Sequence, residues 1–283
     1  ARIGLDAGGS DIKISAVENG NVLFSKEILW QPKVNSNPAY HVKFINDALN
    51  EAATHLKKID AIGVSSAGIY VKNEARVASL FIKVSENDYD AVRRIYIDAA
   101  KRLGAPVTVA NDGDVSALAG AMGLGVGNIM GIAMGTSEAV GYVDKDKNVL
   151  GWINELAFAP VDLCENAMQD EWSTDIGVGC KYFSQDAVIK LAPAAGIELD
   201  ENLSPAEKLK VVQALMEKDD PRAQAIFESI GAYLAYAVVL YSQFYDIEHM
   251  MMLGRVMSGK GGDTILRAVS YTHLRAHETD SYL

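Results

Sequence analysis

Three short turns rich in glycine and hydroxyl side chains follow apolar segments of the sequence. They are Gly8-Gly9-Ser10, Gly135-Thr136-Ser137 and the segment from Gly254 to Gly262. Glycine lets a backbone approach a polyanion closely, and successive N–H groups in such turns form a concavity that favours phosphate. Any one of these turns alone could be only a tight hairpin. Three of them in one chain predict a polyphosphate site.

The first turn differs from the second in the charged residues around it. Asp6 and Lys13 flank the first turn, whereas the aligned positions of the second hold Ala133 and Val140. A carboxylate beside phosphate can hold Mg²⁺, directly or through water. We therefore assign Asp6 and Lys13 to the phosphate site and Asp6 to the metal.

An Asn-Asp pair, Asn111-Asp112, follows the strand-like segment "VTVA" and opens a helix. One interpretation is a helix N-cap, which Asn111, Asp112 or Asp114 could supply. The other makes Asp112 a general base that takes a proton from a hydroxyl nucleophile, a role worth roughly 10²–10⁴ in rate. Glu155 in "INELAFAP" is either a buried acid that meets ligand hydroxyls or a surface carboxylate.

An internal repeat indicates how these residues are positioned. Residues 6–23 and 133–150, at an offset of 127, share five identities in 18 and the same order of strand, small-residue turn, strand, polar turn and strand. The identities are Gly8/Gly135, Ser10/Ser137, Asn21/Asn148, Val22/Val149 and Leu23/Leu150, and Asp11 stands against Glu138. The repeat predicts two domains with similar β-rich openings, 1–110 and 111–268.

Periodicity and punctuation predict the elements of each domain. In the first we expect a strand meander over 3–28 with a hairpin at Asn19-Gly20, helices at about 40–57 and 88–103, and strands at 61–68 and 107–110. In the second we expect a meander over 129–152, helices at about 184–192, 205–218 and 222–245, a strand at 249–254 and a final helix. Ser204-Pro205-Ala206-Glu207 matches a capping box.

Composition excludes several classes of function. The net charge of −11 repels phosphate backbones and anionic surfaces, so neither nucleic acid nor a membrane is an expected partner. The apolar segment at 225–245 is interrupted by polar residues, which predicts a buried helix and not a membrane span. No secretory signal pattern opens the chain, which indicates a cytoplasmic protein. The only cysteines, Cys164 and Cys180, indicate neither a disulfide nor a zinc site.

The last residues, 269–283, differ in pattern from the rest. They read "VSYTHLRAHETDSYL" and resemble translated sequencing-adapter read-through. His273 and His277 lie four apart, but a metal pair is the minor interpretation. We expect a non-native tail after about Ala268.

The motifs "LDAGGSDIK", "GVSSAG", "VANDGD", "GTS" and "LGRVMSGKGG", in this order, resemble the repressor, open reading frame, kinase (ROK) family of the actin and hexokinase superfamily. The resemblance covers about residues 3–268. It implies an α/β fold with two ribonuclease-H-like domains and an interdomain cleft, with ATP between the domains. The implied activity is transfer of the γ-phosphoryl group of MgATP to a hydroxyl of a hexose or hexose derivative.

The resemblance also implies roles for individual residues. Asp112 matches the catalytic base, and Gly68, Asn111 and Glu155 match positions at the sugar. The nucleotide positions are Gly8, Gly9 and Ser10 for the first phosphate loop, Gly135, Thr136 and Ser137 for the second, and Gly254, Ser258, Gly259, Gly261 and Gly262 beside the adenosine. ATP and Mg²⁺ are the implied cofactors and a small sugar the implied partner.

Departures from the family pattern limit what carries over. Ala157-Phe158 replaces a Gly-His pair and "DIGVGCKYF" has one cysteine, so we expect no structural zinc, and the sugar cannot be named. The second loop reads Gly-Thr-Ser where Gly-Thr-Gly is common. The alternatives are a non-catalytic sugar sensor and a degenerate kinase of the same family. Oligomers are frequent in that family, so a homo-oligomer is also a candidate.

Overall fold

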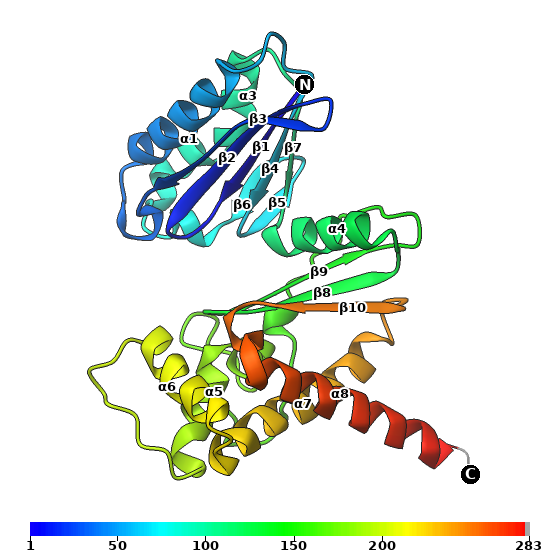
Figure 1. The fold of residues 1–283 in the computed structure, drawn as a ribbon. Helices are drawn as coiled ribbons and strands as arrows, with labels where there is room; N and C mark the ends of the chain where they lie inside the picture. Colours follow the sequence, from blue (N-terminus) through cyan, green and yellow to red (C-terminus); the bar gives the residue numbers. More distant parts are fainter. Residues whose placement is uncertain (281–283) are drawn as a thin grey trace. The chain divides into compact units, whose positions relative to one another are not determined.

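The computed structural model describes the backbone of residues 1–280 and the side chains of residues 1–272. The chain divides into two compact units, unit 1 at residues 1–115 and unit 2 from residue 116 onward (Figure 1). Helix α4 (Asp112–Leu124) contains the boundary. Each unit has a hydrophobic core of its own, and each is described separately below.

Unit 1 is built on a five-stranded sheet with the order β3-β2-β1-β4-β7. The strands are β1 (Arg2–Ala7), β2 (Asp11–Glu18), β3 (Asn21–Leu29), β4 (Ala61–Ser66) and β7 (Val107–Ala110). The first three are antiparallel, and the predicted hairpin is confirmed, with Asn19 at φ 50° and Gly20 at φ 82°. Such left-handed pairs match the twist of the flanking strands.

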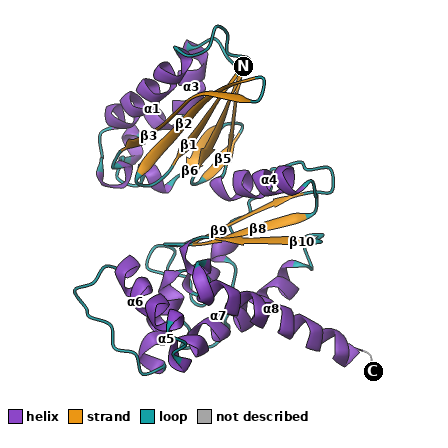
Figure 2. Ribbon diagram, in the orientation of Figure 1, coloured by secondary structure: helices purple, strands orange, loops and turns teal. Residues whose placement is uncertain are grey.

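The remaining elements of unit 1 include a small hairpin and three helices. They are β5 (Ile69–Val71), β6 (Glu74–Val77), α1 (Pro38–Ala53), α2 (Asp90–Arg93) and α3 (Ile95–Arg102), and α1 and α3 pack on the sheet (Figure 2). Helix α1 begins after Asn37, whose side chain accepts a hydrogen bond from the Ala39 N–H. The prediction of a single helix over 88–103 is wrong. The helix is interrupted at Arg94 (φ −108°), whose guanidinium contacts Glu74 on β6 at 3.3 Å.

Parallel pairing brings the polar residues of unit 1 to one edge of its sheet. Strands β1, β4 and β7 run parallel, so Asp6 pairs in register with Ser65 of β4, which in turn pairs with Ala110 of β7. The carboxyl ends of parallel strands meet at one edge, which is where ligands bind in many α/β proteins. The turn at residues 8–10, Gly68 and the start of α4 all follow these strand ends.

Unit 2 has a smaller sheet with the order β10-β8-β9, formed by β8 (Ile129–Met134), β9 (Glu138–Val143) and β10 (His249–Leu253). Strand β10 is parallel to β8, and β9 is antiparallel to it. The prediction that this meander has a third strand, up to residue 152, is wrong. After β9 the chain turns at Asp144, whose carboxylate accepts from the Asn148 N–H, and makes only an isolated bridge between Val143 and Val149.

Four helices complete the described part of unit 2 beyond α4. They are α5 (Gln185–Ala194), α6 (Pro205–Glu217), α7 (Pro221–Tyr241) and α8 (Gly259–Asp280). The predicted capping box at Ser204 and Glu207 is confirmed. Helix α7 is long and apolar enough to cross a membrane, but it buries Ile226, Phe227 and Leu234 in the core of unit 2 and lies beside α8 (Figure 1).

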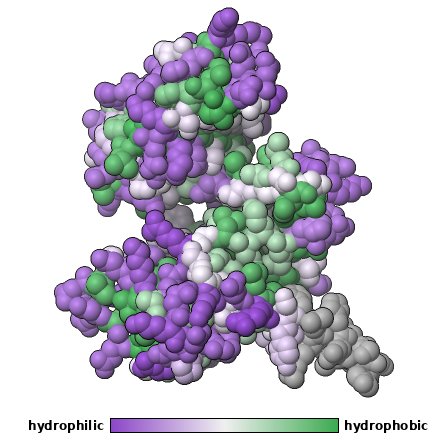
Figure 3. All heavy atoms as spheres, viewed as in Figure 1, coloured by the Kyte–Doolittle hydropathy of each residue, from purple (hydrophilic) through white to green (hydrophobic). Residues whose placement is uncertain are grey.

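Two further features concern exposed surface and the end of the chain. Apolar side chains gather at the surface over α4 and the strands beside it (Figure 3), where Met122 and Leu124 are exposed. The segment 269–283, expected to be a non-native tail, continues α8 as far as Asp280. Its two histidines, His273 and His277, have side chains outside the described residues.

Candidate functional site

The Asn-Asp pair at the start of α4 has two separable tasks. The Asn111 side-chain oxygen accepts from the Gly113 N–H at 2.8 Å, so it caps the helix. Its amide group donates to the carbonyl oxygen of Gly68 at 2.9 Å. Gly68 has φ 129°, and a Cβ there would lie 2.4 Å from the Val77 carbonyl oxygen, so only glycine fits. Two of the sequence-predicted sugar positions, Gly68 and Asn111, are therefore in direct contact.

Asp112 is a half-buried carboxylate at the same helix start. One carboxylate oxygen accepts from the Gly113 N–H at 3.1 Å. Burial raises the pKa of Asp112 above its usual range, and the nearby Asp6 raises it further, while the Gly113 N–H and the Lys33 ammonium lower it. A raised pKa makes this carboxylate a stronger base, as a general base for a hydroxyl requires. Asn111 therefore caps the helix, and the Asp112 carboxylate is available for chemistry.

Asp6 and Lys13 are cross-strand partners on β1 and β2. The Ser65 hydroxyl donates to the Asp6 carboxylate at 2.7 Å, which fixes the orientation of that group. The Lys13 ammonium instead pairs with the Asp11 carboxylate at 2.6 Å. Asp6 is thus presented at the sheet edge, whereas the charge of Lys13 is already matched by a neighbour.

The first two turns have the same internal hydrogen bond. The Gly8 N–H donates to the Asp11 carbonyl at 2.9 Å, and the Gly135 N–H donates to the Ser137 carbonyl at 3.0 Å. Within the described residues, the N–H groups of the next two residues in each turn have no acceptor. Each turn therefore offers two backbone donors and at least one exposed hydroxyl residue, which suits a phosphate group.

The third turn lies beside the second within unit 2. Because β10 and β8 are parallel, Leu253 pairs with Ala133, and Gly254 follows against the Met134 carbonyl oxygen. Gly254 has φ 100°, and a Cβ there would lie 2.3 Å from that oxygen. The structure therefore brings Gly254 next to the turn that begins at Gly135.

The other glycines of the third turn allow close packing of α8. A Cβ on Gly261 would lie 2.6 Å from the Phe227 ring, and one on Gly262 would lie 2.0 Å from the Met257 carbonyl oxygen. Gly259 has φ 67° and lies against Glu217. Ser258 ends the short 3-10 helix Arg255–Met257. These contacts account for the glycines by packing alone, so their expected place beside adenosine stays a prediction.

Glu155, the last sequence-predicted sugar residue, lies in unit 2. It is half-buried and precedes a 3-10 turn, Leu156–Phe158, which packs against β9 and against a second turn, Gly179–Lys181. The other residues predicted to bind the sugar, Gly68, Asn111 and Asp112, belong to unit 1, and so does Asp6.

Two residues that the sequence prediction missed stand next to the two turns. Lys33 lies over Gly9, where a Cβ would be 3.4 Å from the lysine nitrogen. Nothing in the spacing indicates this contact. Glu138 follows the second turn and is buried, with both carboxylate oxygens lacking a hydrogen-bond partner among the described residues. Burial raises the pKa of Glu138 to about 8. The alignment of Glu138 with Asp11 in the repeat is the sequence signal that could have pointed to this residue.

The segment that departs from the family's zinc pattern contains a buried lysine instead. Lys181 contacts the carboxylates of Glu171 at 2.5 Å, Asp186 at 2.8 Å and Asp170 at 3.7 Å. The thiol of Cys180 donates to Asp170 at 3.6 Å. Among residues with described side chains, no group of three or more His, Cys, Asp or Glu is arranged to hold a metal ion.

No protein-family model and no curated protein sequence matches this chain. Solved structures do. A ROK hexokinase from Thermus thermophilus matches with a TM-score of 0.72 and 17% identity, over 95% of this chain and 88% of the other. A ROK family glucokinase from Streptomyces griseus, in complex with glucose and AMPPNP, matches with a TM-score of 0.67 and 19% identity, over 97% and 88%.

A third solved structure is a ROK family transcriptional regulator, a homolog of the E. coli MLC protein. It matches with a TM-score of 0.70 and 18% identity, over 95% of this chain and 68% of the other. The chain therefore has the α/β fold of these ROK structures, which have two domains of the actin and hexokinase type, and the predicted α/β fold class is confirmed.

Proposed function

We propose that this protein is an ATP-dependent sugar kinase of the ROK family, which transfers the γ-phosphoryl group of MgATP to a hydroxyl of a hexose or hexose derivative. The observation that carries the proposal is Asp112. A half-buried carboxylate with a raised pKa stands at the sheet edge that also presents Asp6 and the turn at residues 8–10. A base beside a metal-binding carboxylate and a phosphate turn suits phosphoryl transfer to an alcohol.

The residues of the chain divide the work as follows. Asp112 orients the acceptor hydroxyl and takes its proton, while Asn111, Gly68 and Glu155 hold other hydroxyls of the sugar. The turns at residues 8–10 and 135–137 donate backbone N–H groups to phosphate oxygens, and the segment from Gly254 to Gly262 receives the adenosine. The fit for MgATP rests on the N–H groups that have no acceptor in the described residues and on the Asp6 carboxylate held by Ser65. When bound, MgATP supplies the phosphoryl group and a metal ion that spreads its charge.

The test is sugar-dependent ADP release by the wild type and by Asp112→Asn, against a panel of hexoses, hexosamines and N-acetylated sugars. Asparagine keeps the shape of the side chain and removes the base, so turnover should fall by about 10²-fold or more. Nucleotide binding should be unchanged. Asp98→Asn, an exposed change on α3 with the same loss of charge, is the matched control and should keep full activity. An active Asp112→Asn enzyme would remove Asp112 from the role of base.

A second candidate function is sugar sensing without transfer, which the likeness to a transcriptional regulator favours. In that case a sugar and ATP would each raise the melting temperature of the wild type, but no sugar of the panel would stimulate ADP release. The same panel therefore separates the two functions.

A further inference from the structure

The strand end before Lys33 positions its backbone beside the first turn. Trp30 is buried, its backbone N–H donates to the Ser10 carbonyl at 3.1 Å, and its indole N–H donates to the Gly8 carbonyl at 2.8 Å. Two hydrogen bonds thus tie the end of β3 to both ends of the turn. Lys33 follows three residues later, in the 3-10 helix Pro32–Val34 (η1).

The side chain of Lys33 extends across the open face of Gly9. A Cβ on Gly9 would lie 3.2 Å from Cε and 3.4 Å from the nitrogen of Lys33. The lysine can lie this close to the turn because residue 9 has no side chain. Buried Pro32 and the packing of η1 against the 3-10 helix Ser79–Phe81 hold its backbone.

The charge of Lys33 is not used within the described part of the chain, where its ammonium has no hydrogen bond and no ion pair. The other lysine beside this turn, Lys13, is paired with Asp11 at 2.6 Å. The Lys33 ammonium is nevertheless close enough to Asp112 to lower its pKa. An uncommitted cation therefore lies near both the phosphate turn and the carboxylate that serves as base.

We propose that Lys33 binds the terminal phosphoryl group of the nucleotide and stabilises its charge during transfer. The inference rests on the proposed kinase function and adds to it a catalytic cation that the sequence motifs do not contain. Phosphoryl transfer depends mainly on positioning and on electrostatic stabilisation, and a cation near both the phosphate turn and the base meets both needs. Lys13, whose charge is matched by Asp11, does not have this role.

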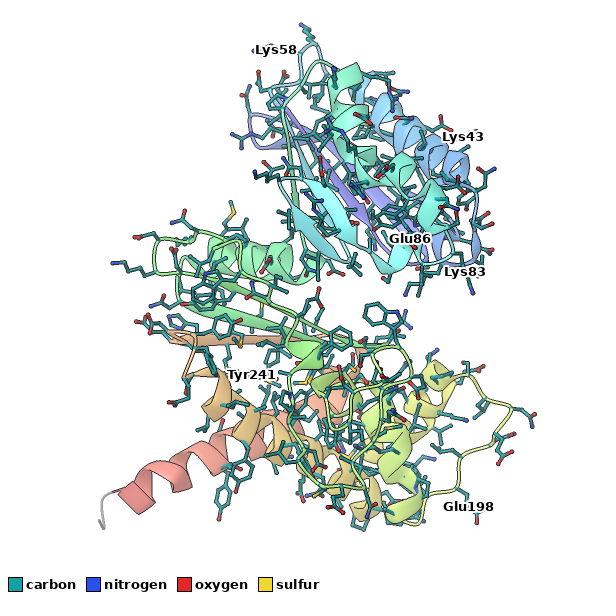
Figure 4. All side chains as sticks on the ribbon, turned by 180° about the vertical axis from the view of Figure 1, so that it is seen from behind. Lys43, Lys58, Lys83, Glu86, Glu198 and Tyr241 are labelled. Atoms are coloured by element: carbon teal, nitrogen blue, oxygen red, sulfur yellow. The ribbon has the colours of Figure 1, made fainter. Side chains whose placement is uncertain are left out.

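The binding experiment compares Mg-AMPPNP with Mg-ADP by calorimetry, because only the first has a terminal γ-group. Lys33→Met should weaken Mg-AMPPNP binding by about 10-fold or more, the value of a charge-assisted hydrogen bond, and leave Mg-ADP binding unchanged. Lys33→Arg keeps the charge and should restore most of the preference. The control is Lys57→Met, which removes an exposed lysine at the amino end of the strands. Figure 4 shows its neighbour Lys58 at the end of unit 1 opposite Lys83 and Glu86.

The kinetic experiment uses the same variants with the best sugar of the panel. Lys33→Met should lower kcat by about 100-fold with the KM for sugar unchanged. It should also move the acid limb of the kcat/KM profile to higher pH, because Asp112 loses a cation that lowers its pKa. A lysine that only supported the fold would move neither the nucleotide preference nor this limb.

The outcomes separate the two proposals. If the wild type binds Mg-AMPPNP but releases no ADP with any sugar, the kinase proposal fails, and the nucleotide preference still decides for or against Lys33. An unchanged preference in Lys33→Met, or an equal loss in Lys57→Met, overturns the role of Lys33. A wild type that binds neither nucleotide overturns both.

Discussion

The turns at residues 8–10 and 135–137 share a backbone pattern, but the acids that follow them have opposite pKa shifts. Asp11 accepts a hydrogen bond from the Ser10 hydroxyl at 2.7 Å and pairs with Lys13 at 2.6 Å. Both contacts lower the pKa of Asp11, and the contact with Lys13 has the larger effect. Glu138 has no partner for its carboxylate oxygens among the described residues, and burial raises its pKa to about 8.

The difference shows two ways in which a turn proposed to bind phosphate can have an acid beside it. An uncompensated carboxylate behind the N–H donors would repel a phosphate group. Beside the first turn, the negative charge of Asp11 is neutralised by Lys13. Beside the second, Glu138 lies under the Gly179–Lys181 turn, and its raised pKa favours the protonated, neutral form at neutral pH. Both arrangements leave a turn that does not repel an anion.

The largest expected effect is the stability of Glu138→Gln at pH 8. Since the pKa of Glu138 is higher in the folded than in the unfolded chain, the free energy of unfolding falls as pH rises from about 4.5 to about 8. Glutamine does not titrate, so the variant should exceed the wild type by about 4 kcal/mol at pH 8, at about 1.4 kcal/mol per pKa unit, and match it near pH 4. Urea unfolding at both pH values measures this.

Asp11→Asn is the matched control for the other turn. Asp11 contributes to the free energy of unfolding above its ordinary pKa of 3.8, and this contribution is lost as pH falls through its lowered pKa. The pair is near the surface, so the variant should lose less than about 1 kcal/mol of unfolding free energy at neutral pH. Equal stability of Glu138→Gln and wild type at pH 8 would contradict the difference between the turns.

A smaller effect should follow from removing one paired lysine in each unit, Lys181 in unit 2 and Lys13 in unit 1. The Lys181 side chain is 5% exposed, whereas that of Lys13 is 59% exposed. Burial alone would lower the pKa of Lys181, but Asp186 and Glu171 raise it, so the ammonium stays charged among carboxylates. Lys181→Met should therefore cost about 3 kcal/mol in unfolding free energy.

Lys13→Met, in solvent, should cost less than about 1 kcal/mol in the same urea experiment. If the two lysine variants lost equal stability, burial would not be what distinguishes the ion pairs of the two units.

The smallest of the three effects tests two glycines within unit 2. Gly254→Ala places a Cβ 2.3 Å from the Met134 carbonyl oxygen at φ 100° and should destabilise by about 2 kcal/mol. Gly135→Ala has no neighbour closer than 3.9 Å and should cost less than about 1 kcal/mol. Thermal unfolding of the two variants side by side measures the difference. A tolerated alanine at 254 would show that this turn moves away from β8.

Much of the architecture was predictable because it depends on local chemistry. The Asn19-Gly20 hairpin, the capping box at Ser204 and Glu207, and the apolar stripe of α7 follow from backbone preference and periodicity. The second meander was extended too far because the repeat in the sequence matched its third strand. In the structure, the loop after β9 closes on Asp144 instead.

The candidate site was predictable where motif and position coincide, and not where a contact joins distant segments. Asn111 and Gly68 could be placed at the same sheet edge, but their hydrogen bond depends on how β4 and β7 align. Lys33 is far from Gly9 in sequence, and the two hydrogen bonds of Trp30 together with the packing of η1 bring it there.

The sequence by itself determined the two β-rich openings, the glycine turns and the acidic start of α4, because turns, caps and alternation are set by neighbouring residues. Only the tertiary structure decided the electrostatics. Whether an acid is charged depends on its hydration and on the cations near it, and these come from segments far apart in the chain. Asp11 and Glu138 stand at equivalent positions of the repeat, yet the contacts with Lys13 and Ser10 favour the charged form of Asp11, while burial favours the neutral form of Glu138.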